Sequence, residues 1–168
     1  ADLSKVTIGD FEEYVKDYRI FLEKKVRPVI HKEEKLYMYA HSMGGCIAAL
    51  LMEEEPELFD AAVLIAPMME IQYGGLPENT ALSITRAANL MGRSEKYIMG
   101  SGAFDGTYDY VHSSIGSEPR YAYLHDIQLH DPNYQTYGGT YAWLTAAVRA
   151  MQQVIRGADR YCTPTLLF

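Results

Sequence analysis

Hydrophobic residues gather in short uninterrupted runs, separated by segments with a different spacing. Residues 36–40, 61–66 and 163–168 form such runs. Continuous apolar runs of this length are typical of parallel strands that are buried on both faces. Between the first two runs, residues 46–52 follow a helical pattern that closes before Pro56. Strand, helix and strand in this order predict a parallel βαβ unit.

A helical pattern also opens the chain. Its apolar positions recur every three or four residues, at Phe11, Tyr14, Val15, Tyr18, Phe21 and Leu22. Thr7 or Asp10 is expected to cap this helix, which should end before Pro28. An amphipathic helix needs a sheet to pack against, and no strand pattern precedes this one. We therefore expect polypeptide segments outside this sequence to complete the sheet.

A second long helical pattern covers residues 140–157, with Gly157 expected as its C-cap. The run at 163–168 follows it as a strand, and the sequence stops inside that apolar run. The elements together predict an α/β protein with parallel strands and flanking helices. This core would comprise residues 1–67 and 140–168 and would be incomplete at both ends.

The segment between these parts is too long and too polar to be a simple connection. Residues 81–90 and 120–129 have the spacing of short amphipathic helices, and a stretch rich in glycine and aromatic residues joins them. We interpret residues 68–139 as a helical lid. The chain's 14 tyrosines and 8 methionines suit a pocket for a polar head and a flexible apolar tail, or equally the ordinary packing of a lid.

Ser42 stands where the first apolar run meets the following helix, within Ala40-His-Ser-Met-Gly44. A serine on a sharp strand-to-helix turn exposes its hydroxyl to a base and to a substrate carbonyl. Such a turn needs small neighbours, and Ala40 and Gly44 meet that need, although the usual pattern has glycine where Ala40 stands. We interpret Ser42 as a nucleophile. The alternative is a serine that only caps the helix.

Composition and charge argue against some classes of function. The chain has 168 residues, of which 48% are hydrophobic and 22% are charged, as in an ordinary globular domain. The net charge of −7 argues against nucleic acid as a partner and disfavours strong electrostatic docking on anionic lipid. Cys46 and Cys162 show no metal-ligand spacing, and we expect buried, reduced thiols. We find no signal-peptide pattern and expect a cytoplasmic protein, with peripheral membrane contact left open.

Several motifs together resemble the lysophospholipase L2 and monoacylglycerol lipase branch of the α/β-hydrolase superfamily. They are Tyr39-Ala-His-Ser-Met-Gly-Gly-Cys46, Phe59-Asp-Ala-Ala-Val-Leu-Ile-Ala-Pro-Met68, Tyr137-Gly-Gly-Thr-Tyr-Ala-Trp143 and Thr163-Pro-Thr-Leu-Leu167. The motifs occur in the order of that family and span nearly the whole chain. The resemblance implies a partial α/β-hydrolase fold and a serine ester hydrolase that acts on lysophospholipids or monoacylglycerols. It implies no metal and no organic cofactor.

By the same resemblance, the chain is an internal segment of a hydrolase. The backbone N–H of Met43 would form one half of the oxyanion hole, while the other donor would precede Ala1. The triad aspartate and histidine would lie beyond Phe168. Because loss of one triad member removes roughly four to six orders of magnitude of rate, the chain alone should be nearly inert.

The substrate pocket is expected to involve residues near the strand ends and in the Gly-Gly-Thr-Tyr-x-Trp element. Our candidates are His41, Met68, Met69, Tyr141 and Trp143. Met68 and Met69 follow the second predicted strand, at the rim where open α/β sheets bind ligands. His41 should point away from the reacting carbonyl, since successive side chains alternate along a strand, so we expect it to pack in the elbow.

The remaining histidines give no further site. His125-Asp126 and His130-Asp131 could suggest a metal or a triad, but no third ligand cluster accompanies them. We interpret residues 131–133 as a turn instead. Two alternatives to the hydrolase stay open: a non-catalytic remnant or lipid-binding fragment, and an acyltransferase or thioesterase on the same scaffold. Exposed strands at the incomplete edges would also favour self-association.

Overall fold

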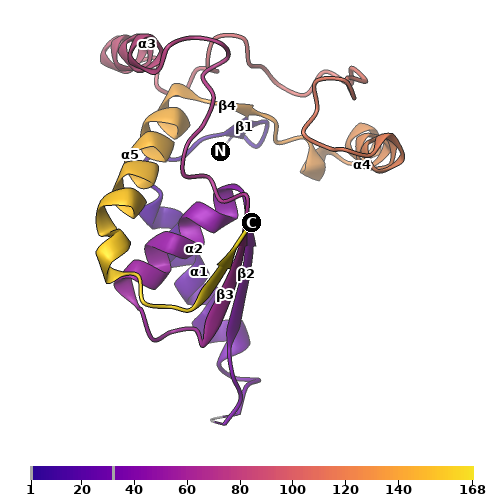
Figure 1. The fold of residues 1–168 in the computed structure, drawn as a ribbon. Helices are drawn as coiled ribbons and strands as arrows, with labels where there is room; N and C mark the ends of the chain where they lie inside the picture. The colour runs from indigo at the N-terminus through magenta and orange to yellow at the C-terminus, as the bar shows by residue number, and fades with distance from the viewer. Residues whose placement is uncertain (1, 32) are drawn as a thin grey trace. The chain divides into compact units, whose positions relative to one another are not determined.

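The computed structural model describes residues 2–31 and 33–168. They form two compact units, and Figure 1 labels most of the helices and strands. The first unit comprises the described part of Ala1–Thr7 together with Leu82–Leu144, and the second comprises Ile8–Ala81 together with Thr145–Phe168. These bounds differ from the expected division at residues 68 and 139. The role of the middle segment as a lid stays a prediction.

The second unit contains a parallel sheet. Its strands are β2 (Tyr37–His41), β3 (Ala61–Ile65) and β5 (Thr165–Leu167), in the order β2-β3-β5. Helix α2 (Met43–Glu54) connects β2 to β3, and Figure 1 shows it beside the sheet together with α1 (Glu12–Phe21). Parallel strands joined by a helix confirm the α/β class that the apolar runs predict.

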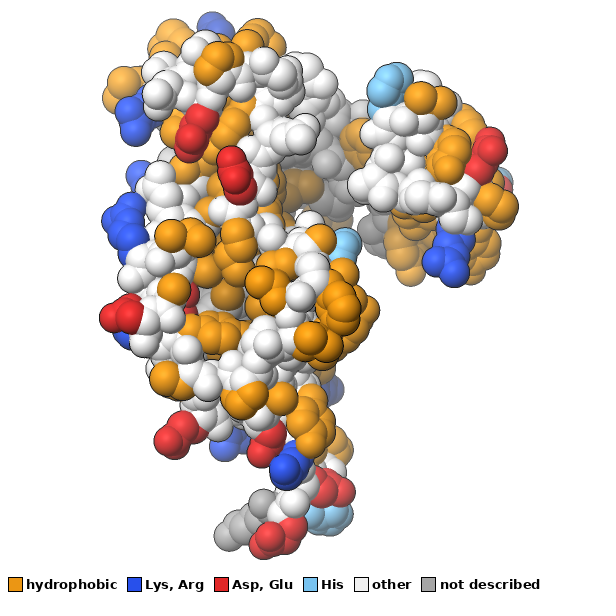
Figure 2. All heavy atoms as spheres, viewed as in Figure 1, with side chains coloured by type: hydrophobic (Ala, Val, Ile, Leu, Met, Phe, Trp, Pro, Cys, Tyr) orange, Lys and Arg blue, Asp and Glu red, His pale blue; other side chains and the backbone are white. Residues whose placement is uncertain are grey.

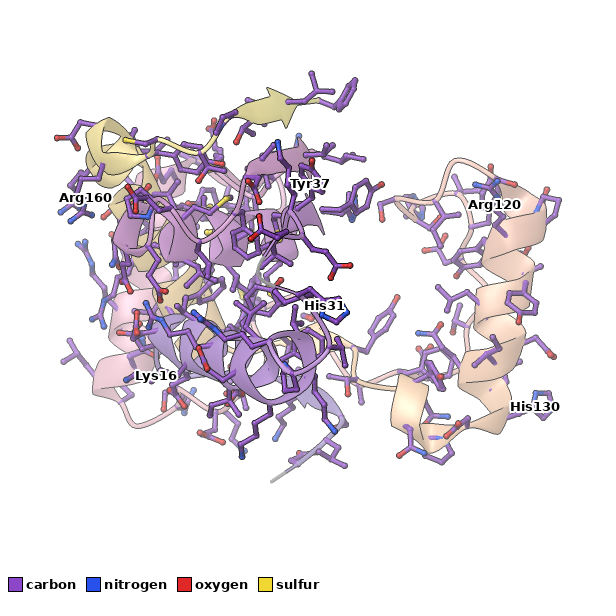
Figure 3. The ribbon with its side chains drawn as sticks, turned by 90° about the horizontal axis from the view of Figure 1, so that it is seen from below. Lys16, His31, Tyr37, Arg120, His130 and Arg160 are labelled. Carbon is purple, nitrogen blue, oxygen red and sulfur yellow. The ribbon has the colours of Figure 1, made fainter. Side chains whose placement is uncertain are left out.

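The two faces of this sheet differ in burial. Met38, Ala40 and Leu64 are buried on the face that α2 covers, whereas Tyr37 and Tyr39 are 63% and 71% exposed. Tyr37 is labelled in Figure 3, and Figure 2 shows hydrophobic side chains gathered over these strands. The expectation that the first run is buried on both faces is therefore wrong for the described chain, because helices cover one face of β2 alone.

Helix α1 begins at a capping box, as predicted. The Glu12 N–H donates to Oδ1 of Asp10 at 3.0 Å, and the Asp10 N–H donates to Oε1 of Glu13 at 3.2 Å. Thr7 does not cap this helix, because its hydroxyl accepts a hydrogen bond from the hydroxyl of Thr140 at 3.0 Å. The helix continues as a π-helical turn over Leu22–Val26, before Pro28.

Helix α5 (Tyr141–Gly157) confirms the second long helical pattern. The side chain of Thr140, which is fully buried, accepts a hydrogen bond from the Trp143 N–H at 3.2 Å at its N-terminal end. Gly157 is not a left-handed C-cap, because its φ is −89°. Glycine leaves room there for side-chain ends, because a Cβ atom at this position would make the Glu53 carboxylate and the Arg160 guanidinium group shift.

The first unit holds a short strand that the sequence did not reveal. Strand β1 (Lys5–Val6) pairs in parallel with β4 (Gly138–Gly139), so a strand does precede α1. Gly138 also packs closely against residues 97–102, because a Cβ atom there would lie 2.3 Å from the Gly102 carbonyl oxygen and 2.7 Å from the Tyr97 ring. Two-residue strands are too short to leave an apolar run, which explains why the pattern in front of α1 was missed.

Helices α3 (Glu78–Leu90) and α4 (Glu118–His130) fall where the sequence predicts them. The 3₁₀-helix Pro132–Tyr134 follows α4 and is capped by Asp131, whose carboxylate accepts from the Asn133 N–H at 2.9 Å. This turn agrees with the interpretation of residues 131–133 and accounts for Asp131 without a metal.

The cysteines differ in environment. Cys46 is fully buried on α2, but Cys162 is exposed, so the expectation of buried thiols holds for the first alone. Burial raises the pKa of the Cys46 thiol to about 12. Cys162 precedes β5 at the end of the sheet, where the described helices leave it uncovered.

Candidate active site

Ser42 has the backbone conformation of a nucleophile elbow. It follows the last residue of β2 and precedes the first residue of α2, with φ 51° and ψ −123°. This combination lies outside the usual regions for residues with a side chain. Such strain concentrates at functional positions, because it persists only where the surroundings impose it. The serine is exposed, so its hydroxyl is accessible to solvent.

Backbone hydrogen bonds hold the elbow on both sides. The Ser42 N–H donates to the carbonyl of Ile65 at 3.1 Å, which continues the β2–β3 ladder past the end of β2. The Ser42 carbonyl accepts from the Gly45 N–H and from the Met68 N–H, each at 2.9 Å. The peptide groups of Ser42 are therefore engaged with α2 and with the segment that follows β3.

The close approach at the elbow falls on Gly45 rather than on Gly44. A Cβ atom at Gly44 would meet no other atom within 4 Å, whereas one at Gly45 would lie 2.6 Å from Cβ and 2.8 Å from Cα of Pro67. The expectation that Gly44 provides the clearance is therefore wrong. Pro67 creates the need for glycine at position 45. Because Pro67 is distant from Gly45 in the sequence, a local motif could not reveal this need.

The start of α2 can supply a hydrogen-bond donor. Met43 is the first residue of this helix, and the first N–H groups of a helix have no acceptor within it. The positive end of the helix dipole favours negative charge at this point. These features suit an oxyanion donor at Met43, a role that stays a prediction. His41 is the exposed last residue of β2.

The candidate pocket residues fall into both units. Met68 belongs to the second unit, is 8% exposed and is joined to Ser42 through its backbone N–H. Met69 belongs to the same unit and lines a groove together with Val148, Met151 and Ile155 of α5. Tyr141 and Trp143 belong to the first unit, where the Tyr141 N–H donates to the Lys96 carbonyl at 3.1 Å. Their place in a substrate pocket stays a prediction.

No histidine is bonded to Ser42 among the residues that the structure describes. His125 is buried, and its Nε2 lies 3.1 Å from the Gly106 carbonyl oxygen. Nδ1 of His130, which is labelled in Figure 3, lies 2.8 Å from the Asp126 carbonyl oxygen. The sequence-adjacent pairs His125-Asp126 and His130-Asp131 are thus each engaged elsewhere. Within the described residues, no group of three or more potential metal ligands occurs.

Ala66 is a feature of this site that sequence reasoning missed. It follows β3 and has φ 40°, and Ser42 and Ala66 are the non-glycine residues with positive φ in the described chain. The only sequence signal was Pro67, which directly follows the apolar run and marks a turn.

Comparison with known proteins identifies the class to which this fold and elbow belong. The family model described as serine aminopeptidase, S33, matches residues 4–168. The chain therefore belongs to this family of serine hydrolases with the α/β-hydrolase fold, as its motifs indicate.

Two relatives indicate which branch of the family this chain is similar to. Lysophospholipase L2 of Escherichia coli K12 is 32% identical over 161 residues, which cover 95% of this chain and 46% of that protein. A probable lysophospholipase L2 of Haemophilus influenzae is 24% identical over 163 residues, covering 95% of this chain and 50% of that protein. The chain thus spans about half the length of these relatives.

A solved structure supports the fold. The crystal structure of Paleococcus ferrophilus monoacylglycerol lipase matches with a TM-score of 0.59 at 19% identity, over 97% of this chain and 55% of that chain. No helix among the described residues is both long enough and apolar enough to cross a membrane.

Proposed function

We propose that Ser42 is the nucleophile of a carboxylic-ester hydrolase that acts on single-chain lipid esters, either lysophospholipids or monoacylglycerols. The observation that carries this proposal is the backbone of Ser42, which has φ 51° at the junction of β2 and α2. A helix-capping serine would instead have an extended, unstrained backbone. Membership of a serine hydrolase family and similarity to lysophospholipase L2 support the same role.

The chemistry follows from the elbow. The Ser42 oxygen attacks the ester carbonyl while its proton passes to a base, and the Met43 N–H stabilises the oxyanion. The ester C–O bond then breaks, the alcohol leaves with the proton, and the acyl group stays on Ser42. A water molecule, activated by the same base, attacks the acyl carbon and releases the fatty acid and the free serine.

The base and its acidic partner are proposed to come from polypeptide outside this sequence. This is consistent with a chain that spans 46% of lysophospholipase L2 and whose described histidines make no bond to Ser42. Because the isolated chain lacks a base, we expect its rate of ester hydrolysis to be roughly four to six orders of magnitude below that of a complete enzyme. Met68, whose backbone N–H is bonded to the Ser42 carbonyl, is proposed to contact the acyl chain. The lipid substrate would bring the protein to membrane surfaces.

A fluorophosphonate probe tests the nucleophile, because it phosphonylates activated serines. The measurement is made on the 168-residue chain and on any longer polypeptide from which it comes, with the adduct located by peptide mass spectrometry. We expect an adduct on Ser42, no adduct in Ser42→Ala, and an unchanged adduct in the control Ser114→Ala. Fatty-acid release from a lysophospholipid, a monoacylglycerol and a diacyl phospholipid then defines the substrate.

The test also separates the alternatives. If Ser42 is not labelled in any polypeptide that contains the chain, a non-catalytic remnant or lipid-binding fragment replaces the hydrolase. If Ser42 is labelled but an added alcohol or thiol receives the acyl group in preference to water, the protein is an acyltransferase. Preference for a thioester over the matching ester would indicate a thioesterase.

A further inference from the structure

The turn after β3, like the elbow beside it, holds a non-glycine residue at positive φ. Ala66 has φ 40° and Ser42 has φ 51°, although both residues carry a Cβ atom. The two residues follow neighbouring strands, because β2 and β3 pair in parallel with His41 opposite Ile65. A left-handed conformation at a non-glycine residue persists only where other contacts impose it. Two such residues at adjacent strand ends suggest that each helps to hold the other.

Hydrogen bonds and a close packing contact connect the two turns directly. The Met68 N–H donates to the Ser42 carbonyl at 2.9 Å, and the Ser42 N–H donates to the Ile65 carbonyl at 3.1 Å. Pro67 packs against Gly45 so closely that a Cβ atom there would lie 2.6 Å from the proline Cβ. The end of β3 and the turn after it thus contact the elbow at Ser42, before the helix start, and at Gly45, after it.

The second turn is itself held from the other side. The Ala66 N–H donates to the Phe168 carbonyl at 2.7 Å, which extends the β3–β5 pairing. The Pro67 carbonyl accepts from the Met69 N–H at 2.9 Å, and the proline ring fixes φ at position 67. The Ala66–Met68 segment therefore has little freedom of its own, so it can act as a rigid support.

We propose that residues 66–68 form a clamp that holds Ser42 in its strained conformation, with Pro67 as a positioning residue for the nucleophile. The direction of the Ser42 side chain depends on its backbone, so release of the Met68 hydrogen bond would let the hydroxyl leave the attacking geometry. The catalytic consequence rests on the proposed function of Ser42, whereas the clamp itself is a property of the backbone.

A pair of glycine variants tests the clamp. Gly45→Ala places a Cβ atom against Pro67, while Gly44→Ala places one in open space. The readout is the hydrogen exchange of the Met68 and Ser42 amides, which NMR monitors in the 168-residue chain. We expect at least a tenfold loss of protection at both amides in Gly45→Ala and less than a twofold change in Gly44→Ala. Unchanged protection in Gly45→Ala would overturn the clamp.

A second variant decides the matter if Gly45→Ala does not fold. Pro67→Ala keeps the Cβ atom but frees φ, so Met68 protection should fall at least tenfold. Its matched control is Pro56→Ala at the end of α2, which should leave Met68 protection unchanged. Equal protection in Pro67→Ala and the parent chain would overturn the positioning role.

The catalytic consequence is read from labelling kinetics. In a polypeptide whose Ser42 reacts with the fluorophosphonate, Pro67→Ala should slow labelling at saturating probe at least tenfold and leave the half-saturating probe concentration unchanged. A purely structural loss would instead lower the reactive fraction at an unchanged rate, and that result would overturn positioning. If Ser42 is never labelled, the proposed function fails, and the amide measurements still decide the clamp.

Discussion

Oε2 of Glu53 lies 3.5 Å from Nη2 of Arg160, yet the two side chains differ sharply in exposure. The Glu53 side chain is 2% exposed and the Arg160 side chain is 59% exposed. Oε1 of Glu53 has no hydrogen-bond partner among the described residues. A solvated arginine screens a buried carboxylate poorly, so burial dominates and raises the pKa of Glu53 above its ordinary value of 4.5.

We expect Glu53→Gln to raise the Tm near pH 7. The folded protein retains the Glu53 proton at pH values where the unfolded chain has lost it, so stability falls as pH rises from 4.5 through the raised pKa. The difference between variant and parent should therefore shrink as pH falls toward 4.5. Thermal unfolding between pH 4 and pH 8 measures this difference in Tm, and Glu57→Gln at an exposed position is the control. A lower Tm at pH 7 would mean that the ion pair outweighs burial.

Thiol reactivity should separate the two cysteines. Exposed Cys162 should react rapidly with an aromatic disulfide at pH 8, whereas Cys46, buried and with a pKa of about 12, should react only on unfolding. We expect one rapid equivalent in the folded chain and a second after denaturant is added. Cys162→Ser should abolish the rapid phase. A rapid phase that survives in this variant would show that α2 opens readily.

The capping box of α1 should contribute measurably to stability. Asp10→Ala removes the acceptor of the Glu12 N–H and should lower the free energy of unfolding by about 1 kcal/mol. Asp17→Ala is the same substitution on the same helix, but it removes no capping hydrogen bond. It should change the free energy of unfolding by less than about 0.5 kcal/mol. Urea unfolding compares the two. Equal effects would mean that the box adds nothing beyond helix propensity.

Strand β2 should promote self-association. It is an edge strand of the described sheet and carries the exposed side chains of Tyr37 and Tyr39. We expect concentration-dependent dimers or larger species in sedimentation velocity, and their reduction by Tyr39→Lys. Tyr123→Lys, at an equally exposed position on α4, should leave association unchanged. A monomer at all concentrations would contradict the prediction.

Local features of the fold could be predicted, because their causes lie within a few residues. The apolar runs located β2, β3 and β5, and the spacing around Ser42 located the elbow. Features that depend on distant partners could not. The pairing of Lys5 with Gly138, the demand that Pro67 makes on Gly45 and the exposure of Cys162 arise from segments far apart in the sequence. The strain at Ala66 belongs to the same group, since alanine gives no sign of a left-handed backbone.

The contact between Gly157 and Glu53 links two positions more than 100 residues apart, because a Cβ atom at 157 would occupy the space of the carboxylate. A shorter residue at position 53 should therefore make alanine at 157 easier to accept. In a library randomised at both positions and selected for folded protein, alanine at 157 should be enriched beside shorter residues at 53. Homologous chains should show the same covariation, so aligned sequences could reveal this contact without any coordinates.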